Sequence, residues 1–66
     1  MYQNLKAEMA RRNITQKELA KTINMSISGL SLKMKGETKF TFNDVIAIKK
    51  AIGTDMSLEQ LFDREA

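Results

Sequence analysis

The sequence contains no cysteine, no histidine and no proline. Without cysteine there is no disulfide or thiolate metal site, and without histidine most zinc sites and the usual general base are missing. The three glycines are isolated, so they form no phosphate-binding loop, and the acidic residues do not pair into a metal site. No repeat, linker or low-complexity stretch is found. We therefore expect no enzyme, no metal and no cofactor.

The chain of 66 residues fits one domain, which we expect to span residues 1–66. A domain this short buries only about 60% of the surface of its unfolded chain, so its stability depends on helix packing and good caps. No apolar run approaches the roughly 18 residues of a membrane span, and the N-terminus lacks the basic and apolar regions of a signal peptide. We therefore expect a cytoplasmic protein with no membrane or small-molecule partner.

The net charge of +3 is unevenly distributed along the chain. Residues 1–39 carry eight lysines and arginines against three acidic residues, a net charge of +5, whereas residues 40–66 carry three against five, a net charge of −2. A basic front half suits a polyanion such as nucleic acid, although charge alone is equally compatible with an ordinary solvated surface.

Apolar residues recur at spacings of three and four and never alternate over the length of a strand, which predicts an all-α fold. Capping boxes at residues 15–18 and 57–60, N-caps at Ser26 and Thr41, and helix ends at Asn13, Gly36 and Gly53 divide the chain into helices. Five helices are expected, over residues 4–12, 15–23, 27–35, 41–53 and 57–62.

The apolar positions of these helices predict the core. The expected inward-facing residues are Leu5, Met9, Leu19, Ala20, Ile23, Leu30 and Met34, and the fourth helix carries Phe42, Val45, Ile48 and Ile52 at helical spacing. Phe40 is expected to fold back onto this core from its loop. Arg11 and Arg12 lie away from the basic face, and one of them is expected to form an internal ion pair with Glu18 or Glu37.

Residues 15–36 predict two short helices that flank a turn of about three residues and meet at a steep angle. Such a crossing needs a small residue where the helices touch, which is Ala20, and a residue that tolerates positive φ in the turn, which is Asn24. Met25 is the apolar residue that fills the angle between the helices after the turn. Leu30 and Met34 are the apolar residues on the inner side of the second helix. Because all of these residues stand in register, the sequence predicts a helix-turn-helix.

This stretch resembles the Cro and phage-repressor type of helix-turn-helix. The resemblance rests on Gln16-Lys17-Glu18-Leu19-Ala20, Met25-Ser26, Leu30-Ser31 and Lys33-Met34-Lys35-Gly36, and it continues through Phe40-Thr41-Phe42 and Leu58, Leu61 and Phe62. It covers nearly the whole chain. It implies the compact five-helix, lambda repressor-like fold and an operator-binding transcriptional regulator, commonly a dimer. The chain departs from the family pattern at Asn24, where glycine is usual.

A second departure lies in the third helix, where the family usually carries long polar residues at the base-reading positions. Here these positions hold Ile27, Ser28, Ser31 and Leu32. Serine can hydrogen-bond to several base edges, and apolar side chains can pack on a thymine methyl group, which predicts a site rich in A·T pairs. Simple exposure or contact with a protein partner is the alternative interpretation of Ile27 and Leu32.

The resemblance also indicates contacts to the phosphate backbone. Gln16 occupies a position that touches a phosphate in the family, whereas Thr15 beside it is expected to act as a cap. The other candidates are Lys17, Ser26, Lys33, Lys35 and Lys39. We expect about half of the four lysines to touch phosphate, since a surface lysine is commonly only a solvated charge.

Two functions follow from these observations. The first is a Cro-like repressor, of phage or prophage type, bound to double-stranded operator DNA. The alternative is a protein-interaction module of the same fold, antitoxin-like or antirepressor-like, which the apolar Ile27 and Leu32 favour. The apolar candidates for a homodimer interface are Met56, Leu58, Leu61 and Phe62, with core closure as the alternative, favoured for Leu58 and Leu61.

Overall fold

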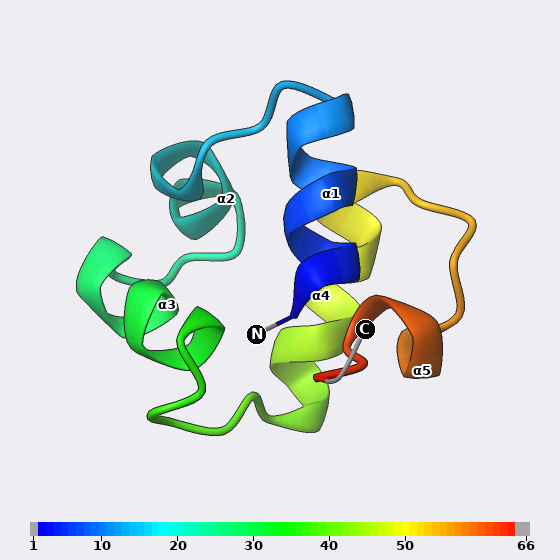
Figure 1. The fold of residues 1–66 in the computed structure, drawn as a ribbon. Helices are drawn as coiled ribbons and strands as arrows, with labels where there is room; N and C mark the ends of the chain where they lie inside the picture. The colour runs from blue at the N-terminus through cyan, green and yellow to red at the C-terminus, as the bar shows by residue number, and fades with distance from the viewer. Residues whose placement is uncertain (1, 65–66) are drawn as a thin grey trace.

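The computed structural model describes residues 2–64, which form five helices and no strand (Figure 1). The helices are α1 (Gln3–Arg11), α2 (Gln16–Thr22), α3 (Ile27–Met34), α4 (Phe42–Ile52) and α5 (Leu58–Leu61). In Figure 1, α1 and α4 cross near the centre, α2 and α3 lie on one side of them, and α5 lies on the other. The predicted all-α class and the five helices are confirmed. No helix in the described residues is long and apolar enough to cross a membrane.

Side chains at the helix starts explain where these helices begin. Thr15 Oγ1 accepts a hydrogen bond from the Glu18 amide at 3.1 Å, and Glu18 Oε1 accepts one from the Thr15 amide at 3.1 Å. The same reciprocal capping box opens α4 and α5, at Thr41 and Ser57, and Ser26 caps α3. Each cap contributes about 1 kcal/mol, which matters in a domain this small.

Residues in the left-handed region end the helices and set the turns. Asn13 after α1 and Asn24 after α2 have φ values of 60° and 59°, while Gly36 and Gly53 follow α3 and α4 with φ values of 85° and 73°. Asparagine and glycine tolerate this region better than other residues do, because their side chains clash least with the backbone there. The predicted cap at Asn13 and the predicted turn at Asn24 are therefore confirmed.

The core lies where all five helices meet. Buried residues from every helix form it, namely Tyr2, Leu5, Met9, Leu19, Ala20, Leu30, Met34, Ile48, Ile52 and Leu61. Phe40 folds back from its loop as predicted, and its ring lies 5.2 Å from that of Tyr2 and 5.1 Å from that of Phe62, in edge-to-face geometry. The loop before α4 is therefore anchored to both ends of the described chain.

Phe42 behaves differently from the rest of its predicted stripe. It shares the helical spacing of Val45 and Ile48, but it is 71% exposed. Phe42 is the first residue of α4, and Phe40, two residues earlier, fills the aromatic cluster at that end of the helix. Helical spacing alone therefore places Phe42 in the apolar stripe of α4, but the core does not extend to that residue.

A buried carboxylate joins α1 to the segment that follows α4. Glu8 is only 3% exposed, and its Oε1 accepts hydrogen bonds from Thr54 Oγ1 at 2.5 Å and from Arg12 Nη1 at 2.8 Å. Arg11 Nη1 lies 2.9 Å from Glu8 Oε2. The predicted partners of the arginines, Glu18 and Glu37, were wrong, because the shared face of α1 already brings Glu8 to both arginines.

Candidate nucleic-acid interface

The turn between α2 and α3 has the tight geometry that a helix-turn-helix requires. The Met25 amide donates to the Ala20 carbonyl at 2.8 Å, and Asn24 provides the positive φ that redirects the chain. Helices α2 and α3 pack against each other, Ala20 of α2 is buried in the core, and Met25 packs against that core. The predicted turn at Asn24 and the predicted inward position of Met25 are therefore confirmed, and the small Ala20 side chain suits a buried position in a closely packed helix pair.

Helix α3 has one buried face and one open face. Leu30 and Met34 point into the core, as predicted. Ile27, the first residue of the helix, is 49% exposed and Leu32 is 43% exposed, Ser28 is exposed, and Ser31 is partly exposed. The structure therefore leaves the four residues that the sequence analysis selected as base readers at least partly accessible to solvent.

The start of α3 depends on a glycine that the sequence analysis did not single out. Ser26 Oγ accepts a hydrogen bond from the Gly29 amide at 3.0 Å and so caps the helix. A Cβ atom added at Gly29 would lie 2.8 Å from that same oxygen, closer than van der Waals contact allows. Gly29 therefore leaves room for the cap, and the Ser26 hydroxyl remains able to donate its own hydrogen to an acceptor outside the protein.

The predicted phosphate ligands do not share one environment. Lys17, Lys35 and Lys39 are exposed, Gln16 is half-buried at the start of α2, and Ser26 is exposed at the start of α3. Lys33 differs, since its ammonium is hydrogen-bonded to Asp44 Oδ2 at the start of α4, and both side chains are only 17% exposed. This ion pair could not be predicted from local sequence patterns, because the two residues belong to different helices.

The electrostatics of that pair follow from its contacts. Burial raises the pKa of Asp44, but hydrogen bonds from Lys33 and from the amide and hydroxyl groups of Thr41 outweigh it, so the pKa lies below its ordinary value. Asp44 is therefore ionised at neutral pH, and the Lys33 ammonium keeps a charged partner inside the protein.

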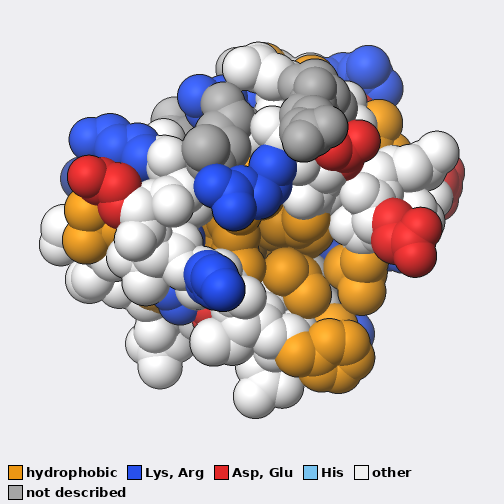
Figure 2. All heavy atoms as spheres, turned by 60° about the horizontal axis from the view of Figure 1, so that its bottom comes forward, with side chains coloured by type: hydrophobic (Ala, Val, Ile, Leu, Met, Phe, Trp, Pro, Cys, Tyr) orange, Lys and Arg blue, Asp and Glu red, His pale blue; other side chains and the backbone are white. Residues whose placement is uncertain are grey.

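The loop of residues 35–41 lies beside α3 and leads to α4 at the bottom of Figure 1. The amides of Glu37 and Thr38 both donate to the Leu32 carbonyl, at 3.0 Å and 3.4 Å. Figure 2 turns this end of the molecule forward and shows an apolar area with basic and acidic side chains around it. Lys35, which directly follows α3, and Lys39 are both exposed in this loop.

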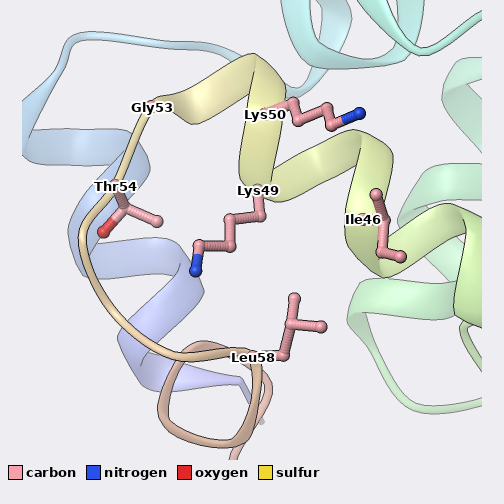
Figure 3. Close-up of a pocket in the computed structure, with 6 residues that line it drawn as sticks. All are labelled: Ile46, Lys49, Lys50, Gly53, Thr54 and Leu58. Atoms are coloured by element: carbon pink, nitrogen blue, oxygen red, sulfur yellow. The ribbon is translucent and has the colours of Figure 1, made fainter.

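A groove lies on a different part of the surface, between α4 and the start of α5 (Figure 3). Its volume is about 410 Å³, and its lining consists of Ile46, Lys49, Lys50, Gly53, Thr54 and Leu58. Among the predicted interface residues, Leu61 is fully buried, while Met56 and Phe62 pack against the core. Leu58 is half-buried and lines the groove.

The fold and the open face of α3 define a DNA-binding helix-turn-helix domain. A family model described as Helix-turn-helix, of the Cro/C1 type, matches residues 5–58, and the chain belongs to that family. The predicted resemblance is thereby confirmed. No curated protein and no solved structure matches the chain. Within residues 2–64, no group of three or more acidic side chains is arranged to hold a metal ion.

Proposed function

We propose that this protein is a sequence-specific transcriptional repressor, Cro-like and of phage or prophage type, that inserts α3 into the major groove of double-stranded operator DNA in the cytoplasm. The observation that carries the proposal is the outer surface of α3, where four candidate base readers are at least partly exposed while Leu30 and Met34 of the same helix are buried. The major groove of B-DNA is wide enough to admit an α-helix, and only an outward-facing side chain can reach a base edge there.

The chemistry of the open face favours sites rich in A·T pairs. Ser28 and Ser31 carry hydroxyl groups that both donate and accept, so they suit several base edges. Ile27 and Leu32 are apolar and exposed, and thymine is the base that offers a methyl group in the major groove. Sequence preference on this face therefore comes from small hydroxyl groups and methyl contacts rather than from long bidentate side chains.

Phosphate contacts surround the open face. Gln16 and Lys17 at the start of α2, Ser26 at the start of α3, and Lys35 and Lys39 in the following loop provide hydrogen-bond donors, and the three lysines add positive charge that is exposed to solvent. Contacts of this kind place the protein on the duplex in one register, while the bases are read by α3.

A single module of this size reads only a few base pairs, so we include a homodimer in the proposal. The groove between α4 and α5 suits a second copy, because Ile46 and Leu58 offer apolar surface beside Lys49 and Lys50, while Asp55 and Glu59 of the same region carry the opposite charge. Leu58→Asp is expected to shift the sedimentation of the protein toward the monomer and to weaken binding to a two-half-site duplex. Unchanged sedimentation would count against this interface.

The test of DNA binding is selection of duplexes from a random pool by the parent protein, followed by Ser28→Ala and Lys35→Ala. Ser28→Ala is expected to change which sequences are selected, because it removes a base contact that, as a single neutral hydrogen bond, is worth about 0.5–1.5 kcal/mol. Lys35→Ala is expected to weaken binding to all duplexes alike and to lower the magnitude of the salt slope by about 0.9.

Lys6→Ala serves as the matched control, since Lys6 is exposed on α1, which contributes none of the proposed contacts. It removes the same charge and is expected to leave the selected sequences and the salt slope unchanged. If Ser28→Ala and Lys35→Ala both behave like the parent protein, the assigned contacts are wrong.

A protein-interaction module is the second candidate, and the exposure of Ile27, Leu32 and Phe42 favours it. Gel-shift titrations on random DNA over rising salt separate the two functions. DNA binding weakens steeply with salt, because the release of counterions from the DNA gains less entropy when the surrounding salt concentration is higher. Absence of DNA retention even at low salt, together with a protein complex that salt does not disturb, would favour the second candidate.

A further inference from the structure

Lys33 occupies an unusual position for a basic residue of a DNA-binding helix. Its side chain is 17% exposed, whereas Lys35 and Lys39, which follow it, are open to solvent. The Lys33 ammonium is held by Asp44 Oδ2 rather than left free for an outside ligand. To contact phosphate, the Lys33 ammonium would have to move away from the Asp44 carboxylate. That carboxylate would then remain partly buried without its charged partner, which is costly.

Asp44 is in turn held in place by the start of α4. The Thr41 amide donates to Asp44 Oδ2 at 3.0 Å, and the Asp44 amide donates to Thr41 Oγ1 at 3.1 Å. The oxygen that binds Lys33 is thus also part of the capping box. Because a capping box fixes the first turn of its helix, Lys33 is bonded to a rigid point and not to a mobile side chain.

The pair spans the loop that separates the two helices. Helix α3 packs closely against α2 and has at most slight helix-to-helix packing against α4. The Lys33–Asp44 contact therefore joins the second half of α3 directly to the beginning of α4. Between these two points lie residues 35–41, which include Lys35 and Lys39.

We propose that the Lys33–Asp44 ion pair is a positioning clasp, which holds residues 35–41 in a fixed place relative to α3 so that the loop meets phosphates while α3 meets bases. The inference rests on the proposed DNA binding. It makes Lys33 a positioning residue, and it gives the acidic Asp44 a favourable role in binding a polyanion.

The sign of one substitution separates this role from ordinary electrostatics. Asp44→Asn removes a negative charge near the proposed DNA face and keeps a side-chain oxygen for the Thr41 amide. If Lys33 were a phosphate ligand restrained by Asp44, the substitution would release it and strengthen binding. If the pair is a clasp, the same substitution loosens the loop and weakens binding.

The experiment measures affinity for a duplex selected by the parent protein, at several salt concentrations, for Lys33→Met, Asp44→Asn and the double variant. Each single variant is expected to bind about tenfold more weakly, with the salt slope of the parent, and the double variant is expected to bind no more weakly than either. Lys35→Met is the matched control that removes a lysine from the same region and reduces the magnitude of the slope by about 0.9. Lys33→Arg keeps the pair and is expected to bind like the parent.

Hydrogen exchange of the Glu37 and Thr38 amides provides a second measurement, which needs no DNA. Their exchange is expected to become faster in Lys33→Met and Asp44→Asn, while the amides of α1 keep the protection of the parent. Circular dichroism of each variant is the check that its helix content equals that of the parent. If Asp44→Asn loses helix content, the clasp is tested by Lys33→Met and Lys33→Arg instead, because these substitutions leave the capping box intact.

Three outcomes would overturn the clasp. Tighter binding by Asp44→Asn, a smaller salt slope for Lys33→Met, or parent-like affinity and exchange in both variants would each show that the pair does not position the loop. These results leave the proposed function standing if the parent selects DNA. A parent that retains no duplex at low salt overturns the proposed function and the clasp together.

Discussion

Gly29 and Ser26 show how closely single atoms control the start of α3. The Ser26 cap contributes about 1 kcal/mol, and alanine in a helix is favoured over glycine by a similar amount. A methyl group at position 29 would come within 2.8 Å of Ser26 Oγ, so that hydroxyl would have to shift for the cap to persist. The cap therefore offsets the poor helix propensity of the glycine, and the glycine spares the cap that displacement.

Gly29→Ala is accordingly expected to change the free energy of unfolding by less than about 0.5 kcal/mol in the parent, because the displacement of the Ser26 cap offsets the gain in propensity. In a Ser26→Ala background, where no cap remains to be lost, the same substitution is expected to stabilise the protein by about 1 kcal/mol. Urea unfolding of the four proteins measures both values. Equal effects of Gly29→Ala in the two backgrounds would show that the methyl group and the cap coexist.

Helix α3 combines buried residues of the core and exposed residues that we propose to contact DNA within eight residues. Leu30 is fully buried and packs in the core shared by all helices, whereas Leu32, two residues later, is 43% exposed. Because stability depends on apolar area removed from water, the two leucines contribute to different properties of the protein. The outer residues of α3 can therefore be substituted without loss of its packing against the core.

Leu30→Ala is expected to destabilise the domain by about 2–5 kcal/mol, through lost transfer energy and the cavity that remains. For a domain this small, that loss approaches the whole stability. Leu32→Ala is expected to change stability by less than about 0.5 kcal/mol and to alter the selected DNA sequences instead. Thermal unfolding and duplex selection on the same two variants provide the measurements, and a large loss of stability in Leu32→Ala would contradict the division into two faces.

Two carboxylates connect helices that are distant in the sequence. Hydrogen bonding from Thr54 and the charges of Arg11 and Arg12 outweigh burial and hold the pKa of Glu8 below its ordinary value. The pKa of Asp44 is also lowered, since its contacts with Lys33 and Thr41 outweigh burial. Lowered pKa values in the folded state mean that the unfolded state binds more protons at acidic pH.

The stability of the protein is therefore expected to be constant from pH 7 to pH 5 and to fall below about pH 4.5, as these carboxylates become protonated. Glu8→Gln is expected to melt at a lower temperature than the parent at neutral pH and to show a weaker dependence on acid, because its ion pairs are already lost. Glu37→Gln, in the exposed loop after α3, is the control and is expected to follow the parent. Thermal melts from pH 3 to pH 7 test this, and identical curves for Glu8→Gln and the parent would disprove it.

Much of the fold and the outline of the site could be predicted from the sequence, because they depend on local chemistry. The caps at Thr15, Ser26 and Thr41 act within three residues, and helical spacing separates Leu30 from the open face of α3. Long-range partners could not be predicted in this way. Glu8 meets Thr54 across 46 positions, and Lys33 meets Asp44 across a loop and a helix boundary.

The sequence by itself determined the five helices, the turn at Asn24 and the residues on the outer face of α3, since neighbours along the chain decide caps, φ preferences and helical faces. Only the tertiary structure decided that Phe42 stays in solvent, that Glu8 joins both arginines to Thr54, and that Lys33 faces a carboxylate. These outcomes depend on how whole helices pack, because packing determines which side chains lose contact with water and which charges come together.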